Sequence, residues 1–216
     1  VEDWRDIRWE KFQLDGEGHR VQMFLDAAKQ FRAVDPKLRL IGTVWSPPAW
    51  MKENGAIVDT ISAAIDGTSY VPKGRRIANR VRPACHMHFV KWLVEMVKLH
   101  KAHDVPLHAV SPGNEVMFTQ TFESCVWTAA DFAAIVALLG KLLAEEGLGD
   151  VLVFGPETMT GGNWGKGLAN DAYVQAIERN DAARRYLTRW ATHGYTDGFV
   201  TDTNAASARG FWGMIE

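Results

Sequence analysis

The feature that most constrains the fold is a regular alternation of short apolar runs with longer amphipathic stretches. The apolar runs are typical of buried strands, and they lie at 38–45, 107–115, 151–157 and 190–196. The amphipathic stretches have apolar residues at helical spacing and lie at 17–32, 88–103, 128–143, 170–190 and 205–216. Thr128 with Asp131 resembles a capping box that starts one of these helices. Strands that alternate with helices, without hairpin signals between them, predict a parallel sheet with crossover helices.

Two parallel architectures fit this order: a doubly wound open sheet and a (β/α)8 barrel. The sequence has neither a G-x-G-x-x-G fingerprint nor a P-loop, which disfavours the first. The polar and aromatic residues of interest stand at the carboxyl ends of the strands, where barrel active sites are built. They are Trp45, Ser46, Asn114, Glu115, Glu157, His193 and Tyr195. We therefore predict a TIM-barrel type α/β fold.

Only four strand–helix units are visible in the 216 residues, whereas a complete barrel has eight units and about 250 residues. We expect a partial barrel, with residues 1–216 forming a single domain. A long segment at 51–86 follows the first strand, on the predicted active face. It carries a basic group, which is either a solvated surface or a contact for an acidic substituent of a substrate: Lys73, Arg75, Arg76, Arg80 and Arg82.

The composition disfavours nucleic-acid binding and a membrane span, and it points to a surface that binds sugars. The formal net charge of −2 provides no basic field for nucleic acid, and no apolar run approaches the roughly 18 residues of a membrane span. Nine Trp residues are many for this length. A single Trp is most often a core residue, but several lie in Gly/Pro-rich segments, where flat aromatic faces suit sugar rings. They are Trp45, Trp50, Trp127 and Trp164.

The sequence offers weak support for other chemistry. Cys85, His86 and His88 cluster, but they match neither H-E-x-x-H nor a paired C-x-x-C spacing, so we expect no metal and no cofactor. Ser-based nucleophilic catalysis lacks its G-x-S-x-G motif. Cys85 and Cys125 are either a pair in an exported protein or two buried free thiols.

Five segments together resemble the successive strand-end motifs of glycoside hydrolase family 30, in that family's order and spacing. They are "TVWSPPAWMKENG" (43–55), "AVSPGNEV" (109–116), "FESCVWTAADF" (122–132), "GPETMTGGNW" (155–164) and "HGY" (193–195). The family contains retaining β-glycosidases on a (β/α)8 barrel, among them xylanases, glucosylceramidases and β-1,6-glucanases. The resemblance implies that this chain is the central part of such a barrel, with the third to sixth strands.

The resemblance also assigns roles. Glu115 matches the general acid/base, and Asn114 matches the residue that binds the sugar's 2-hydroxyl. The remaining positions are expected to border the sugar site or contact substrate: Trp45, Trp50, Trp164, His193, Tyr195 and Glu157. The family commonly has Gln before Asn-Glu and Pro after it, whereas this chain has Gly113 and Val116, a change of loop shape more than of chemistry.

Retaining hydrolysis requires a protonated acid and a second carboxyl as nucleophile, roughly 5–5.5 Å away. In the family this nucleophile is a Glu at the end of the seventh strand. Glu216 arrives a few residues early and in a helical context, so we expect the nucleophile to be missing from this chain. Glu157 and Glu123 are more readily explained as hydrogen-bonding residues.

The expected function is retaining hydrolysis of a β-linked glycan. Xylan is favoured through the basic segment, while β-glucosides and β-1,6-glucans stay open. The alternative is a non-catalytic carbohydrate-binding half-barrel, stable only in a homo-oligomer or with its missing half, since open parallel edges promote association. The resemblance favours a secreted or extracellular parent protein.

Overall fold

The computed structural model describes residues 3–7, 20–65, 78–159 and 169–193. The principal strands are β1 (Leu40–Thr43), β3 (Leu107–Ser111), β5 (Leu152–Thr158) and β6 (Leu187–Thr192). The helices between and around them are α1 (Arg20–Val34), α2 (His86–Ala102), α3 (Ala129–Glu145), α4 (Ala169–Glu178) and α5 (Asp181–Tyr186). Short elements complete the described chain: the strands β2 (Ala63–Ala64) and β4 (Phe118–Thr119), and the 3-10 turns Trp4–Asp6, Ala49–Met51 and Pro83–Cys85.

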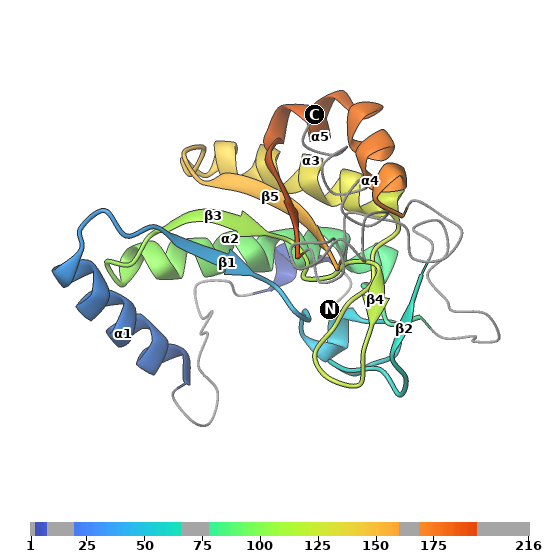
Figure 1. The fold of residues 1–216 in the computed structure, drawn as a ribbon, viewed down its shortest axis with the longest axis horizontal. Coiled ribbons are helices and arrows are strands. Elements are labelled where there is room, and N and C mark those ends of the chain that lie inside the picture. The colour runs from blue at the N-terminus through green and yellow to red at the C-terminus, as the bar shows by residue number, and fades with distance from the viewer. Residues whose placement is uncertain (1–2, 8–19, 66–77, 160–168, 194–216) are drawn as a thin grey trace, which may run out of the picture.

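The four principal strands form one parallel sheet in the order β1-β3-β5-β6 (Figure 1). The register places Thr43 of β1 beside Ser111 of β3, and Val110 of β3 beside Val153 of β5. Each connection is a crossover through at least one helix, as the alternation of the sequence predicts. The expected partial (β/α) barrel with four parallel strands is confirmed. Because all four strands run the same way, their carboxyl ends share one edge, where the candidate site lies.

Helices α2 and α3 lie side by side behind the sheet and bury its core (Figure 1). Phe89 and Leu93 of α2 and Phe132 and Leu139 of α3 are completely buried between helices and strands. The predicted cap of α3 is confirmed, since Thr128 Oγ1 accepts a hydrogen bond from the backbone N–H of Asp131 at 3.3 Å.

The prediction of one helix over 170–190 is wrong in part. Asn180 interrupts the segment, accepts a hydrogen bond from the N–H of Ala183, and so starts a second helix, α5. The chain becomes extended at Leu187 and pairs with Val153 of β5. Residues 187–190 therefore belong to the sixth strand of the chain, and pairing with a neighbouring strand overrides their local helical pattern. The helix expected at 205–216 lies outside the described residues.

Two loops at the carboxyl edge pair with one another, which the sequence pattern did not reveal. Ala63–Ala64 forms an antiparallel pair with Phe118–Thr119, and isolated bridges join Lys52 to Val81 and Val58 to Glu123. The described parts of segment 51–86 therefore form a layer over the loop that follows β3 (Figure 1). Two-residue strands escape a search for periodicity because they are too short to show one.

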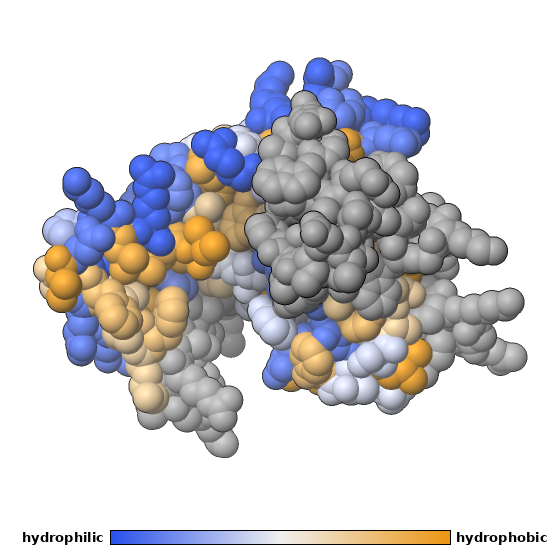
Figure 2. Space-filling view, viewed as in Figure 1, coloured by the Kyte–Doolittle hydropathy of each residue, from blue (hydrophilic) through white to orange (hydrophobic). Residues whose placement is uncertain are grey.

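Apolar side chains remain exposed around α1 and the edge strand β1, visible as orange atoms on the left of Figure 2. The exposed residues are Met23, Phe24, Phe31, Val34 and Ile41. Among the α1 side chains whose burial is described, from residue 22 onward, Leu25 and Ala28 are buried, in a small cluster with Val105. Among the helices of the described ranges, none has the length and apolar character needed to cross a membrane.

Candidate active site

The ends of β3 and β5 are tied together at Glu115. The strand β3 ends at Ser111, and the N–H of Asn114 donates to the carbonyl of Val44 at 2.8 Å. The N–H of Glu115 donates to the carbonyl of Glu157 at 3.0 Å. Asn114 and Glu115 are both buried, with 5% and 6% of their surfaces exposed. The structure therefore holds the Asn-Glu pair at the strand ends, rather than in a solvated loop.

Both carboxylate oxygens of Glu115 have a hydrogen-bonding neighbour. Gln120 Nε2 donates to Oε2 at 2.6 Å, and His193 Nδ1 lies 2.9 Å from Oε1. Gln120 comes from the loop after β4, and His193 comes directly after β6. A buried carboxylate with two such partners is fixed in position and has its desolvation compensated.

Glu157 lies on the other side of the same histidine. Its Oε1 accepts a hydrogen bond from Thr43 Oγ1 at 3.0 Å, and its Oε2 lies 3.5 Å from His193 Nε2. The N–H of His193 donates to the carbonyl of Thr158 at 2.8 Å, which fixes the imidazole between the two acids. The hydrogen bond with Glu115, and then that with Glu157, raise the pKa of His193 to about 9. The ring is therefore an imidazolium at neutral pH and bridges two carboxyl groups.

The backbone at both acids is unusual. Among the described residues, positive φ outside glycine occurs at Asp104, Glu115 and Glu157, with φ of 46° at Glu115 and 52° at Glu157. A left-handed conformation is unfavourable for a residue with a Cβ, and it persists where the surroundings determine it. Such strain concentrates at functional sites, so the two acids stand out by geometry as well as by charge.

Two of the predicted aromatic residues lie on the surface beside this edge. Trp45 follows β1, is 47% exposed, and contacts Phe122 with ring centroids 5.9 Å apart. Trp50 is 46% exposed and meets His88 edge to face at 5.8 Å. The exposed pair of Trp45 and Phe122 joins the loop after β1 to the loop after β3.

Trp127 is not a surface aromatic, which corrects the expectation that it forms part of a binding face. Its exposed fraction is 1%, and it packs against Phe89 with ring centroids 5.2 Å apart. The packing of Trp127 also explains why position 113 is a glycine here, where glycoside hydrolase family 30 commonly has Gln. A Cβ at Gly113 would lie 2.8 Å from Val116 Cγ1 and 3.2 Å from Trp127 Cδ1, so there is no room for a side chain.

Several predicted residues lie outside the described part of the chain: Trp164, Tyr195, Glu216, Lys73, Arg75 and Arg76. The two described members of the basic group contact protein atoms. Arg80 forms an ion pair with Glu53, with Nε and Oε2 2.8 Å apart, and Arg82 donates to the carbonyl of Trp50.

Cys85 and Cys125 are free and buried. Burial raises the pKa of Cys125 to about 12, so its thiol stays protonated and unreactive at neutral pH. Burial lowers the pKa of His86 and of His88, which favours their neutral forms. The described residues contain no group of three or more His, Cys, Asp or Glu side chains placed to share a metal ion.

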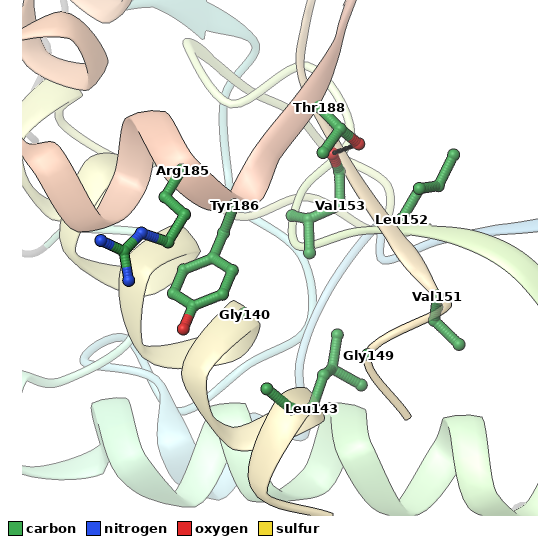
Figure 3. Close-up of a pocket in the computed structure, with 10 residues that line it drawn as sticks. Gly140, Leu143, Gly149, Val151, Leu152, Val153, Arg185, Tyr186 and Thr188 are labelled. Carbon is green, nitrogen blue, oxygen red and sulfur yellow. Dashed lines mark hydrogen bonds between the residues drawn. The ribbon is translucent and has the colours of Figure 1, made fainter. Parts of the chain in front are cut away.

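A cavity of about 180 Å³ lies at the opposite end of the strands from the carboxylate site, between α3, α5 and the start of β5 (Figure 3). Leu143, Val153 and Tyr186 line it, and Thr188 Oγ1 donates to the carbonyl of Val153 beside it. It is at the amino ends of the strands, where barrel residues contribute to stability more than to catalysis. It is therefore separate from the carboxylate site.

Three contributors to the site were not anticipated from sequence: Gln120, Thr43 and Phe122. Thr43 is the last residue of a predicted strand, so its position beside the other strand ends was accessible to sequence reasoning. Gln120 and Phe122 lie in a loop whose path depends on its pairing with segment 51–65. Phe122 opens one of the family-like motifs, but that motif gives it no role, and no local pattern marks Gln120.

Two solved structures have a fold similar to that of this chain. A family 30, subfamily 8 xylanase, Xyn30A from Clostridium acetobutylicum, superposes with a TM-score of 0.64 at 22% identity, over 91% of this chain and 42% of the xylanase. An endo-β-1,6-glucanase superposes with the same TM-score at 19% identity, over 88% of this chain and 38% of that enzyme. The chain has the fold of glycoside hydrolase family 30 proteins. The resemblance inferred from the strand-end motifs is thereby confirmed.

By sequence, the chain is similar to an endo-1,6-β-D-glucanase of Neurospora crassa. The two are 26% identical over 145 residues, which is 66% of this chain and 26% of the glucanase. No model of a protein family matches the chain. The chain thus spans between 26% and 42% of the length of these relatives.

Proposed function

We propose that this single-domain chain carries the acid/base half of a retaining β-glycan hydrolase site, with Glu115 as the acid/base. The observation that carries the proposal is the fixed carboxyl of Glu115 at a barrel strand end, hydrogen-bonded to His193 at 2.9 Å. A general acid needs a proton at hand, and the His193 imidazolium holds one beside Oε1. Asn114, held at the same strand end, binds the sugar's 2-hydroxyl, and Trp45 and Trp50 border the sugar.

The second carboxyl of the reaction is supplied from outside the described residues. Glu157 is the nearest alternative, but Thr43 and His193 engage its two oxygens. We assign it to holding the His193 imidazolium rather than to nucleophilic attack. Tyr195 and Trp164 are proposed to bind substrate on the basis of their sequence motifs alone.

The substrate class is a β-linked glycan, with xylan and β-1,6-glucan as the two polymers to test first. The basic character of segment 51–86 favours xylan, but this support is reduced because Arg80 and Arg82 contact protein atoms. Similarity to a β-1,6-glucanase supports the other polymer. Xylan and β-1,6-glucan are polymers, which are degraded outside the cell. We therefore place the whole protein outside the cell.

The test is hydrolysis of xylan, β-1,6-glucan and the aryl β-xyloside and β-glucoside by the full chain and by Glu115→Gln. With the remaining barrel strands supplied, we expect turnover by the unmutated chain and a loss of at least a hundredfold in Glu115→Gln, in line with general acid catalysis. Glu123→Gln is the matched control, because Glu123 is an exposed glutamate of the same loop. Equal rates for parent and Glu115→Gln contradict the assignment.

A second candidate function is carbohydrate binding without turnover, favoured by the exposed pair of Trp45 and Phe122. Calorimetric titration with the same glycans separates the two. Binding that survives in Glu115→Gln, with no hydrolysis by the parent chain alone, supports the binding function. Hydrolysis that appears only after addition of the remaining barrel strands supports a half-site.

A further inference from the structure

Lys52 is a buried lysine whose ammonium group lies between two loops at the carboxyl edge of the sheet. The residue is 2% exposed, and its Nζ donates to Ser46 Oγ at 2.9 Å and to the carbonyl of Ser124 at 2.7 Å. Ser46 belongs to the loop that follows β1, and Ser124 belongs to the loop between β4 and α3. One side chain therefore connects these two loops directly.

Both acceptors are themselves held by other hydrogen bonds. The Ser46 hydroxyl donates to the carbonyl of Pro47 at 3.1 Å, which leaves its lone pairs to accept from Lys52. The N–H of Ser124 donates to the carbonyl of Ile57 at 3.1 Å. Burial lowers the pKa of Lys52 to about 8, so the group is still mainly an ammonium at pH 7. Hydrogen bonds from a charged donor are short and strong, and they compensate the cost of burying the charge.

The same two loops carry the exposed aromatic pair. Trp45 directly precedes Ser46, and Phe122 lies two residues before Ser124. The two ring centroids are 5.9 Å apart with an interplanar angle of 45°, and both side chains are exposed. Side chains this exposed bury little apolar surface, so their arrangement depends on where the loops lie.

Trp45 is fixed through both of its neighbours in the chain. On one side, the carbonyl of Val44 accepts from the N–H of Asn114 at 2.8 Å, which continues the strand pairing. On the other side, Ser46 Oγ accepts from Lys52. The first bond fixes Trp45 relative to β3, and the second fixes it relative to the loop between β4 and α3. Loss of the ammonium should therefore separate the two loops while the strand pairing persists.

We propose that Lys52 is a positioning residue that sets the spacing of Trp45 and Phe122 and so shapes an aromatic platform for one sugar ring. The inference rests on the proposed function, because the ligand is the β-linked glycan assigned to this site. The flat apolar face of a sugar ring stacks on aromatic side chains, and rings held in place before binding lose less conformational entropy. Lys52 is buried, so it acts on glycan affinity through the two aromatic residues.

The first measurement is the nuclear Overhauser effect between the ring protons of Trp45 and Phe122, in the full chain at pH 6.5, where Lys52 is charged. We expect this effect in the parent chain and a loss of its intensity in Lys52→Met and in Ser46→Ala. Lys52→Met keeps the apolar stem of the side chain, and Ser46→Ala removes one acceptor while the lysine stays in place. An unchanged intensity in either folded variant overturns the proposal, as does its absence from the parent chain.

The second measurement is glycan affinity by isothermal titration calorimetry, with xylo-oligosaccharides and β-1,6-gluco-oligosaccharides. We expect Lys52→Met to weaken the affinity by about threefold, which is within the range for one aromatic contact. In the Trp45→Ala background, Lys52→Met should have no further effect, because the platform has already lost a ring. Additive losses from the two substitutions overturn the proposal.

Lys91→Met is the matched control, because Lys91 is another buried lysine with fixed partners. Its Nζ forms ion pairs with Glu95 at 2.8 Å and with Glu146 at 2.7 Å, on α2 and at the end of α3, outside the two loops. This variant should lose stability in urea unfolding but keep the ring contact and the glycan affinity. An equal loss of affinity in Lys91→Met and Lys52→Met would reflect general destabilisation and overturns the proposal.

The two measurements separate this inference from the proposed function. If the parent chain binds no glycan, the binding assigned to Trp45 fails, and the proposal that Lys52 positions the pair stands or falls on the ring contact. If parent, Lys52→Met and Trp45→Ala bind glycan with the same affinity, the platform is not the sugar site and the proposal is overturned.

Discussion

His193 Nδ1 lies 2.9 Å from Oε1 of Glu115, while its Nε2 lies 3.5 Å from Oε2 of Glu157. The imidazole therefore lies between the acids at the ends of β3 and β5 and attracts both carboxylates electrostatically. With a pKa of about 9, it is protonated at neutral pH, and the resting site contains one cation between two acids. The His193 imidazolium therefore holds one exchangeable proton beside Glu115, the proposed acid.

This arrangement predicts a pH dependence of stability. The pKa of His193 is raised from 6.5 to about 9 on folding, so its contribution is complete below pH 6.5 and is lost as the pH rises to 9. Because the ring is partly exposed, we expect a loss of about 1–2 kcal/mol over this window after allowing for solvent screening. Urea unfolding of the parent chain at pH 6, 7, 8 and 9 measures it.

His193→Gln should remove this part of the slope, and His103→Gln is the control because His103 lies at the far end of α2. A slope between pH 6.5 and 9 that is the same in the parent and in His193→Gln contradicts the imidazolium bridge.

Gly113→Ala should destabilise the chain. The added Cβ would lie 2.8 Å from Val116 Cγ1 and 3.2 Å from Trp127, in a fully buried environment. Overpacking of this kind costs about 1–3 kcal/mol. Gly149→Ala is the matched control, since a Cβ there would lie 3.8 Å from the Cα of Ala144, an ordinary contact distance. Denaturant unfolding of the two variants should therefore differ, and equal stabilities would show that the Trp127 packing is loose.

The strands and the position of the acids could be predicted because they depend on local pattern. A parallel strand with polar residues directly after it places those residues at one edge, whatever the loops do. Glu115, Glu157 and His193 were placed together in this way. The cap at Thr128 was predictable for the same reason, since its hydrogen bond spans three residues.

The rest depended on contacts between segments far apart in the sequence. Trp127 was expected on a binding face because it stands in a loop, yet it is buried by Phe89 of α2. Gln120 is 5 residues from Glu115 in the chain, but its position depends on Asp59 and Lys52, which lie in another loop. A single sequence does not show which loops pair, so neither outcome had a local signal.

Lys52 predicts a second, opposite pH dependence. Burial lowers its pKa from 10.5 to about 8. Between these values the unfolded chain binds more protons than the folded chain, so this residue makes stability rise with pH. Lys52→Met should flatten the stability curve between pH 9 and 10.5. Lys141→Met is the control, because Lys141 is exposed on α3 and pairs only with Glu145 in the described contacts. Equal slopes in parent and Lys52→Met contradict a buried, poorly solvated amine.

The exposed aromatic pair predicts a contribution to glycan binding that is separate from stability. Trp45 and Phe122 are 47% and 45% exposed, so truncating either to Ala removes little buried core. If a sugar ring stacks on this pair, each truncation should weaken glycan affinity by about 1 kcal/mol, roughly fivefold, with unfolding midpoints unchanged. Isothermal titration calorimetry with xylo-oligosaccharides and β-1,6-gluco-oligosaccharides measures the affinity. Phe31→Ala provides the control, because Phe31 is an exposed aromatic residue of α1 (66%), and α1 lies away from the carboxyl ends of the strands in Figure 1. Affinities that fall to the same extent in Phe31→Ala, or not at all in Trp45→Ala, would assign the sugar to another surface.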